Sequence, residues 1–494
     1  MTRDLPGCTL ALLGILLVGG CSEMVPPAPP SVDVPQSFVQ METTAVEGIR
    51  LPLIANGSDL TPTPFQPIPA TPAFSPTQAP TQASPLSPTR SSLDPRSPAV
   101  TAIPPPMPLL GDQDTASDHL LNILLIGSDQ RAKGSFRTDT LIIASIRPPE
   151  QVVTLISIPR DLFVFIPGWT MQRINTAYLH GETSKYPGGG AALLKDTILY
   201  NLGVRIDHLA IVNFVGFKAI VDTLGGIDLP LACAYTDWRV IDPEGDLENP
   251  NNWRLYTAGP GMVHMDGELA LWYARSRLRS NDYDRGRRQQ EVLRGMYTMA
   301  MKLNIIPRLP ELFKQLDGMV QTDLSLEQIL SLVPMALKLD ASRIRSFYIN
   351  NRLVKAWWTP QGAQVLLPKR QALEALIQEA MSPLDAGEEL RQRTLVEVQN
   401  ANAGANWDVL AAERLHYAGF ETSLSPPAGD SKSKTRLYDL TGGYDPDQSA
   451  SLLALFGLPA DRLQGEANPG SGASYLLILG SDFDPCFNPS KINH

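Results

Sequence analysis

The chain has 494 residues, a formal net charge of −10 at pH 7 and 43% hydrophobic residues. This length predicts two or three domains, and the apolar content is enough to build their cores. The negative charge argues against a protein that binds nucleic acid or an anionic membrane through a general basic surface.

The N-terminus is similar to an export signal. Residues 9–20 form an apolar run that ends in small residues and is shorter than the roughly 20 residues of a membrane-spanning helix. The run stops at Val18-Gly-Gly-Cys21, which resembles a bacterial lipobox. We expect a lipoprotein signal peptide over 1–21 and a lipid anchor at Cys21, on the extracytoplasmic face of the cell membrane. An ordinary cleaved signal peptide and an uncleaved short anchor are the alternatives, because the basic region before the run is weak.

Residues 22–117 form a tract rich in Pro, Ser, Thr, Ala and Gln, which cannot bury enough apolar surface to order itself. We interpret this tract as a disordered tether. Beyond the signal and the lipidated cysteine, only Cys233 and Cys486 remain. An exported protein can join two such cysteines. Nothing in the sequence shows that they meet, so two separate cysteines are the prediction.

Strands and helices alternate from residue 118 to about 350. Predicted strands lie at 120–126, 139–146, 151–158, 208–213, 227–231 and 343–349, the second and third forming a hairpin. Predicted helices lie at 191–202, 214–224, 266–272, 284–304 and 324–339. This order predicts an α/β sandwich around one sheet.

A charged connector at 351–393, which contains one helix, leads to a smaller α/β domain at 394–484. The strands predicted in this domain lie at 395–399, 420–424 and 475–479, and the helices at 407–418 and 449–456.

The stretch 272–290 concentrates arginine against the acidic trend of the chain and contains no lysine. Arginine presents a planar fork that matches phosphate or carboxylate oxygens in pairs. Arg275 and Arg277 alternate, which on an extended backbone directs both to one face, and Arg285, Arg288 and Gln289 lie at helical spacing, where they can share one face. A strand end and a helix start would then aim several guanidiniums at one polyanion. A solvated basic face paired with nearby carboxylates is the alternative.

Carboxylates and arginines also lie at the ends of the predicted strands. Asp129 follows the first strand, Arg137 and Asp139 lie at the start of the second, and Arg160 and Asp161 follow the third. Paired carboxylates on neighbouring loops are the usual ligands of Mg²⁺, and arginines beside them neutralise phosphoryl oxygens. Together these residues predict a metal-assisted phosphoryl-transfer site, although each Arg–Asp pair taken alone is equally typical of a loop salt bridge.

The chain resembles the LytR-CpsA-Psr family from about residue 119 to 302. The motifs that carry the resemblance are GSD at 127–129, RTDT at 137–140, SIPRD at 157–161, RINTAY at 173–178, LGGID at 224–228, DGELAL at 266–271, RSR at 275–277 and DYDRGRRQQ at 282–290. A looser resemblance to the LytR C-terminal domain covers 394–484.

This resemblance implies an α/β fold, an α-β-α sandwich with a central mixed sheet and a deep apolar pocket for a polyprenyl chain. It also implies an enzyme that transfers a glycopolymer from a polyprenyl-pyrophosphate carrier to peptidoglycan, with Mg²⁺ or Mn²⁺. By similarity, Asp129 and Asp139 hold the metal. The residues that hold the pyrophosphate by similarity are Arg137, Arg160, Arg275, Arg277, Arg285 and Gln289, supported by Asp282. The catalytic residues implied are Arg137, Arg160, Arg275 and Arg277, with Asp161 as a candidate base on reach alone.

Two features depart from the family pattern. The usual anchor is a transmembrane helix rather than a lipobox, and the segment between Arg277 and Asp282 is short. Two other functions stay open. One is a non-catalytic envelope protein that binds the lipid carrier or acts as a regulator of the transcriptional attenuator type. The other is a polyprenyl-pyrophosphate hydrolase. The absence of a nucleic-acid-binding signature in the sequence argues against direct DNA binding.

Overall fold

The computed structural model describes residues 103–109, 120–128, 138–243, 245–278, 282–305, 307, 309–315, 319–402, 406–428, 432–442, 445–465 and 472–486. The chain divides into two compact units, 1–60 and 61–494, and every described residue belongs to the second. The predicted signal peptide, the lipid anchor at Cys21, most of the tether, Asp129, Arg137 and the side chain of Asp282 lie outside the described residues.

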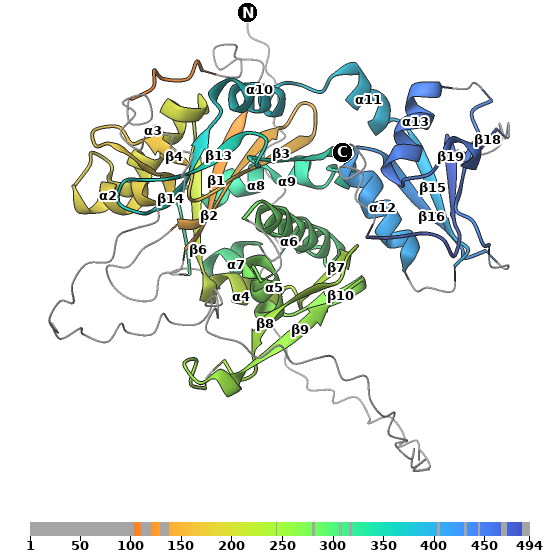
Figure 1. Ribbon diagram of the computed structural model, residues 1–494, viewed down its shortest axis with the longest axis horizontal. Helices are drawn as coiled ribbons and strands as arrows, with labels where there is room; N and C mark the ends of the chain where they lie inside the picture. The colour runs from red at the N-terminus through yellow and green to blue at the C-terminus, as the bar shows by residue number, and fades with distance from the viewer. Residues whose placement is uncertain are drawn as a thin grey trace, which may run out of the picture. The chain divides into compact units, whose positions relative to one another are not determined.

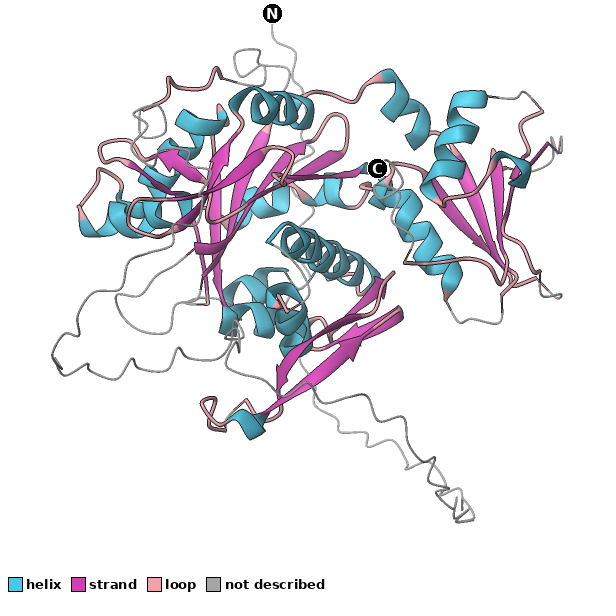
Figure 2. Cartoon of the chain, viewed as in Figure 1, coloured by secondary structure: helices cyan, strands magenta, loops and turns pink. Residues whose placement is uncertain are grey.

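A six-stranded mixed sheet forms the centre of the larger domain, which confirms the predicted fold class (Figures 1 and 2). The strand order is β11-β6-β1-β2-β3-β12. The strands are β1 Leu121–Ser128, β2 Thr138–Arg147, β3 Val152–Ile158, β6 His208–Asn213, β11 Val320–Thr322 and β12 Ile344–Tyr348. β1 is parallel to β6 and antiparallel to β2, which in turn is antiparallel to β3.

Helices cover both faces of this sheet. On one face, β1 to β3 pack against α3 (Gly189–Leu202) and α10 (Arg370–Met381). On the other face, Ile142 and Leu155 pack against α6 (Asp282–Lys302). Strands buried on both faces are almost continuously apolar, which explains why runs such as the one in β1 are easily recognised in the sequence. The three layers are the predicted α-β-α sandwich.

The remaining helices of this part are short. They are α2 Ala177–Thr183, α4 Phe214–Thr223, α5 Gly267–Arg275, α7 Leu309–Gln315, α8 Leu326–Ser331, α9 Val333–Ala336 and α11 Ala386–Gln392. The single helix predicted at 324–339 is wrong, because two helices, α8 and α9, occupy this range. Pro334 lies in the first turn of α9, where its missing N–H is tolerated, but it cannot continue a helix from α8.

Several two-stranded pairs were not predicted. The pairs are β4 Phe163–Phe165 with β5 Met171–Arg173, β8 Tyr235–Val240 with β9 Trp253–Ala258, β10 Gly261–Met265 with the predicted strand β7 Ile227–Leu231, and β13 Val354–Trp358 with β14 Gln364–Pro368. β13, β14 and α10 belong to the stretch 351–393, and Leu353 and Leu373 enter the same core as the central sheet. Residues 103–109, from the predicted tether, lie against α3, where the Met107 N–H donates to the Tyr200 carbonyl at 2.8 Å.

A second sheet of five strands forms the smaller C-terminal domain, in the order β16-β15-β19-β17-β18. Its elements are β15 Leu395–Asn400, α12 Trp407–Tyr417, β16 Glu421–Ser425, β17 Arg436–Asp439, α13 Pro446–Leu455, β18 Leu463–Gly465 and β19 Tyr475–Leu479. The strands and helices predicted here agree with the structure within about three residues, whereas β17 and β18 were missed.

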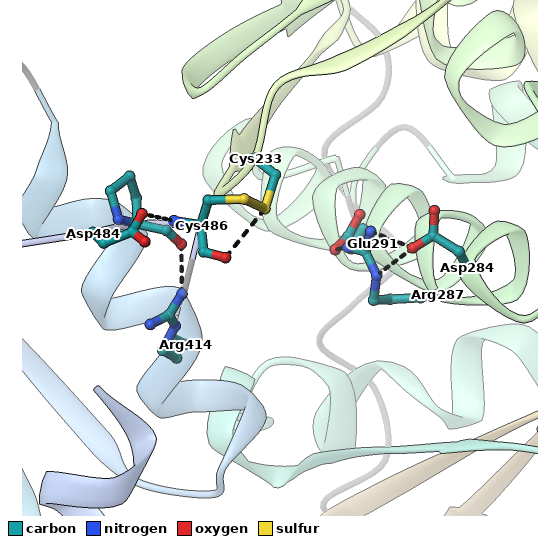
Figure 3. Close-up of a disulfide and its surroundings, with 8 residues drawn as sticks. Cys233, Asp284, Arg287, Glu291, Arg414, Asp484 and Cys486 are labelled. Atoms are coloured by element: carbon teal, nitrogen blue, oxygen red, sulfur yellow. Dashed lines mark hydrogen bonds and ion pairs between the residues drawn. A yellow bond between two sulfur atoms is a disulfide. The ribbon is translucent and has the colours of Figure 1, made fainter. Parts of the chain in front are cut away.

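The two cysteines form a disulfide, so the prediction of two separate cysteines is wrong (Figure 3). Cys233 follows β7, and Cys486 follows the last strand, 253 residues further along the chain. The Arg414 side chain on α12 donates to the Pro485 carbonyl, which holds the segment beside Cys486. Residues this far apart meet only through tertiary structure, and no local pattern in the sequence signals it.

Candidate functional site

The arginine stretch begins at the end of a helix. Asp266 caps α5, since its carboxylate accepts a hydrogen bond from the Leu269 N–H at 2.7 Å. Apolar residues at helical spacing then extend the helix to Arg275. The prediction of an extended backbone through Arg275 and Arg277 is therefore wrong. The turn after α5 is held by Asp237 of β8, which accepts from the N–H groups of Arg277 at 2.5 Å and Leu278 at 3.0 Å.

Helix α6 carries the second half of the stretch, and one buried glutamine fixes its position on the sheet. The Gln290 amide donates to the Ser157 hydroxyl at 2.9 Å and to the Phe347 carbonyl at 3.1 Å. Gly286 lies against β3, so closely that a Cβ there would stand 3.2 Å from the Cβ of Ser157. The start of α6 is thereby held against the ends of β3 and β12.

Four charged side chains form a continuous network beside this helix. The Arg160 guanidinium donates to Asp139 at 2.5 Å and lies 3.5 Å from Asp161. Asp161 in turn lies 3.3 Å from the Arg173 guanidinium, which also donates to the Gln364 carbonyl at 2.7 Å. Arg160 and the carboxylate of Asp139 each keep about a quarter of their surface exposed. The network therefore places Arg160 firmly while leaving it open to a ligand.

Arg285 and Gln289 reach the same place from α6. Arg285 donates to the Asp139 carbonyl at 3.2 Å, and Gln289 donates to the Thr140 hydroxyl at 2.8 Å. Together with Tyr348 these residues line a small cleft with room for about 20 Å³. Burial raises the pKa of Tyr348 to about 12, so its hydroxyl stays protonated at neutral pH.

The other arginines of the stretch differ in surroundings. The Arg275 guanidinium lies 3.9 Å above the Phe214 ring, at the start of α4. Arg288 is fully buried and donates to the carbonyls of Tyr273 and Ser276, so it fixes the end of α5. Arg287 is paired with Asp284 and Glu291 on the exposed side of α6 (Figure 3). The stretch thus divides into groups that face the cleft and groups that hold the fold.

The described residues offer part of the proposed metal site. Asp139 is present at the cleft, and the Ser128 hydroxyl, one residue before Asp129, is buried without a hydrogen-bond partner among the described residues. An unsatisfied hydroxyl beside two acidic positions suits a hard cation with oxygen ligands. Within the described ranges, no group of three or more His, Cys, Asp or Glu residues has metal-ligand geometry.

A large apolar cavity of about 750 Å³ lies on the α6 face of the sheet. Its walls come from β6, β11 and helices α4, α6, α7 and α8. The apolar residues that line it are Ala210, Val212, Ile220, Leu224, Met296, Ala300, Ile305, Leu312, Phe313, Val320, Leu324, Leu326 and Ile329. A cavity of this volume with this lining suits a long hydrocarbon chain.

Helix α6 joins the polar cleft to the cavity. Arg285 and Gln289 face the cleft, whereas Met296 and Ala300 line the cavity. Because an α-helix has 3.6 residues per turn, these four positions fall in one stripe along α6. Gln289 and Met296 are about 10 Å apart along the helix axis. One face of one helix therefore presents cationic and polar groups at its start and hydrocarbon further on.

The structure brings together Asp139, Arg160, Asp161, Arg285 and Gln289, all of which were predicted from the sequence. Arg275 and Arg277 lie on the neighbouring turn. Three residues of the site were missed. Asp237, Gln290 and Tyr348 act through contacts with residues far away in the sequence. No motif includes Asp237 or Tyr348, and Gln290 ends the motif at 282–290 without a predicted role of its own.

No helix among the described ranges is long and apolar enough to cross a bilayer.

The fold and the site define an α-β-α protein in which helix α6 joins a polar cleft, lined by Arg285 and Gln289, to an apolar cavity. The LytR_cpsA_psr family model matches residues 101–382, and the chain belongs to this family. It is 30% identical over 214 residues to the polyisoprenyl-teichoic acid–peptidoglycan teichoic acid transferase TagU of Enterococcus faecalis, a match that covers 42% of this chain and 63% of the relative. It is 31% identical over 215 residues to TagU of Oceanobacillus iheyensis, covering 43% and 62%.

The chain thus spans less than two thirds of the length of these curated relatives. Among solved structures, the crystal structure of Bacillus subtilis TagV superposes with a TM-score of 0.44 at 24% identity, covering 54% of this chain and 100% of that one.

Proposed function

We propose that this protein is a phosphotransferase that moves a glycopolymer from a polyprenyl-pyrophosphate carrier to peptidoglycan. The observation that carries the proposal is the single stripe of α6 that joins Arg285 and Gln289 to Met296 and Ala300. A polyprenyl pyrophosphate has an anionic head and a hydrocarbon tail, and this stripe offers both environments in order. The family and the transferase names of the relatives point to the same substrate class.

In the proposed reaction, a sugar hydroxyl of the acceptor attacks the phosphorus that bears the glycopolymer. A new P–O bond forms, the bond from this phosphorus to the bridging oxygen breaks, and polyprenyl phosphate leaves with that oxygen. Arg160, Arg285 and Arg277 would hold the phosphoryl oxygens, whose negative charge develops along the reaction. The arginines therefore supply electrostatic stabilisation and alignment.

The hydroxyl proton must pass to a base. Asp161 lies between two guanidiniums, those of Arg160 at 3.5 Å and Arg173 at 3.3 Å. Each of its two carboxylate oxygens thus faces a guanidinium rather than the place of an acceptor hydroxyl. We therefore assign Asp161 the role of positioning Arg160. The group that takes the proton would lie near the acceptor hydroxyl, and none of the residues named here is assigned to it.

We also propose that Mg²⁺, or Mn²⁺, is held by Asp129 and Asp139. When bound, such an ion neutralises phosphoryl oxygens of the substrate. The catalytic domain would work on the extracytoplasmic side of the cell membrane, anchored through lipid on Cys21 and separated from it by the Pro-rich tether. The proposed partners are the lipid-linked polymer, the peptidoglycan acceptor and the membrane, with no nucleic acid.

The test measures polyprenyl phosphate released by the purified full chain from a lipid-linked glycopolymer, with and without peptidoglycan and with Mg²⁺ or a chelator. A transferase attaches polymer to peptidoglycan in step with the release. Release without attachment would instead identify a pyrophosphate hydrolase. Tight binding without release, under every metal condition, would identify a carrier-binding or regulatory protein and overturn the proposal.

A sharper test replaces Asp139, the candidate metal ligand that lies among the described residues. Asp139→Asn keeps the shape and a hydrogen-bond acceptor for Arg160 but removes the charge. A metal contributes several kcal/mol of charge stabilisation, so turnover should fall roughly a hundredfold or more. Asp447→Asn, on the exposed start of α13, is the matched control and should leave turnover unchanged. Equal, metal-stimulated turnover in both variants would remove Asp139 from the site.

A further inference from the structure

Four large apolar side chains are exposed around the cavity. They form what we call the apolar rim, and their exposed fractions are 50% for Leu303, 38% for Phe313, 39% for Leu330 and 56% for Leu337. They come from four separate segments: the turn after α6, helix α7, helix α8 and the turn after α9. Since they lie on different elements, their exposure is not the outer edge of one amphipathic helix.

Each rim residue is tied to the cavity wall. Phe313 itself lines the cavity, and Leu330 directly follows Ile329, which also lines it. The hydroxyl oxygen of Tyr297, another lining residue, lies 2.8 Å from each of the carbonyls of Ala336 and Leu339, on both sides of Leu337, and can donate its proton to either. Leu303 lies two residues before the lining residue Ile305. The apolar lining of the cavity therefore reaches the molecular surface at Phe313, and the other rim residues lie in segments that supply the lining or are bonded to it.

Charged residues border the rim in both signs. Exposed lysines adjoin three of its residues in sequence, as Lys302, Lys314 and Lys338. Acidic residues of the same segments are Glu311, Glu327 and Asp340. Because the two sets balance, attraction to anionic lipid is not the main force. Long lysine side chains beside apolar ones are instead typical of surfaces at a lipid–water boundary, where the stems lie along hydrocarbon and the ammonium groups reach water.

We propose that the apolar rim seats directly on a lipid bilayer, so that the tail of the carrier passes from the bilayer into the cavity without crossing water. This inference rests on the proposed function. A polyprenyl tail that left the bilayer through water would pay free energy for every methylene exposed. An apolar mouth in contact with the bilayer removes that exposure.

The test uses the full chain on vesicles of phosphatidylethanolamine and phosphatidylglycerol that contain no polyprenyl lipid. A photoreactive benzoylphenylalanine replaces Leu337, or, as matched controls of similar exposure, Leu424 on β16 or Leu255 on β9. We expect phospholipid adducts several-fold more abundant at 337 than at either control. Equal yields at the three positions, or adducts at 337 that join a second copy of the chain in place of lipid, would overturn the proposal.

A second measurement separates this proposal from the proposed function. Leu337→Glu should lower turnover of carrier embedded in vesicles several-fold, yet leave turnover of a short-tailed, water-soluble pyrophosphate analogue unchanged. Leu424→Glu should change neither. If wild type turned over neither substrate, the proposed function would fail. The yield of phospholipid adducts at position 337 would still test the bilayer contact. If Leu337→Glu matched wild type on vesicles, the bilayer contact would have no role in carrier delivery.

Discussion

The arginines of the stretch 272–290 have two different roles, one in holding the fold and one at the cleft. Arg288 is fully buried and holds two carbonyls at the end of α5, whereas Arg285 reaches the cleft beside Asp139. The sequence predicts the charge of both but not their direction. What separates them is rotation about α6, because positions three apart on a helix point about 60° apart.

Geometry, rather than charge alone, should matter at Arg285. Arg285→Lys keeps the positive charge but loses the planar fork that bridges two oxygens. A charge-assisted hydrogen bond contributes about 1.5–3 kcal/mol, so turnover should fall about tenfold to a hundredfold. The measurement is release of polyprenyl phosphate, with thermal unfolding to establish that the variant is folded.

Arg287→Lys is the control for this substitution, two residues away on the exposed side of the same helix. Exposed ion pairs contribute about 0–1 kcal/mol, and the control should be almost silent. The same loss in both variants, or in neither, would show that the fork of Arg285 does not act on the substrate.

At the scale of single residues, the sequence predicted those site residues whose chemistry follows from their type. Asp139, Arg160, Arg285 and Gln289 were predicted, and they meet in the structure. Gln290 was not singled out, although it pins α6 to β3 and β12. Its partners lie more than 50 residues away, and glutamine in a helix otherwise indicates only an exposed position.

Close packing of α4 against α5 sets where the arginine stretch begins. Gly267, in the first turn of α5, lies so near α4 that a Cβ there would stand 2.7 Å from both the Cα and the carbonyl oxygen of Lys218. Its N–H donates to Asp222 of α4 at 2.7 Å. The two helices also meet where Arg275 stacks on Phe214. The absence of a side chain at Gly267 thus helps to place Arg275.

Gly267→Ala should therefore destabilise the protein. The added methyl group meets backbone, which cannot move without separating the helices, and forced overpacking costs about 1–3 kcal/mol. Gly465→Ala is the control, because no described residue other than its chain neighbours comes within 4 Å of the Cβ position, and it should change stability by less than about 0.5 kcal/mol. Urea unfolding measures both. A smaller cost at Gly267 than at Gly465 would contradict the close approach.

The elements found most reliably in the sequence are those with strong periodicity. The strand His208–Asn213 was predicted with its exact bounds, and α6 within two residues. The hairpin β8–β9 was missed, because residues such as Thr236, Asp237 and Arg239 break the alternation of apolar and polar side chains. Its Asp237 is buried for a structural reason, since it holds the turn after α5.

Across the whole molecule, two of the contacts among the described residues join the C-terminal domain to the domain of the central sheet through specific side chains. The Cys233–Cys486 disulfide is one. The other is Arg294 of α6, only 4% exposed, whose guanidinium lies 3.3 Å from Glu413 of α12 and 4.1 Å from the Tyr417 ring. The helix that carries Arg285 and Gln289 is therefore also the helix to which α12 is fastened. Neither joint has a signal in the sequence, because each links residues more than 100 positions apart.

The Arg294–Glu413 joint should depend on pH. Burial alone would raise the pKa of Glu413, but His416 and Arg294 outweigh it and lower the pKa below its ordinary value. A carboxylate with a lowered pKa stabilises the folded state above its unfolded pKa of about 4.3. That contribution is lost as the pH falls through the lower, folded-state pKa. The joint should thus hold at neutral pH and weaken in acid below about pH 4.

Glu413→Gln isolates this contribution, since the amide keeps the shape but does not titrate. At pH 7 the variant should be less stable than wild type by about 1–3 kcal/mol, the typical cost of losing a hydrogen bond to a charged group. The difference should shrink as the pH falls below about 4, because wild-type Glu413 then becomes neutral as well. Glu389→Gln is the control, since its pair with Arg393 is largely exposed and should contribute about 0–1 kcal/mol at any pH. Urea unfolding of the three proteins across this range measures the effect. A gap between wild type and Glu413→Gln that stays constant down to the lowest pH would mean that the charge of Glu413 does not hold α12 to α6.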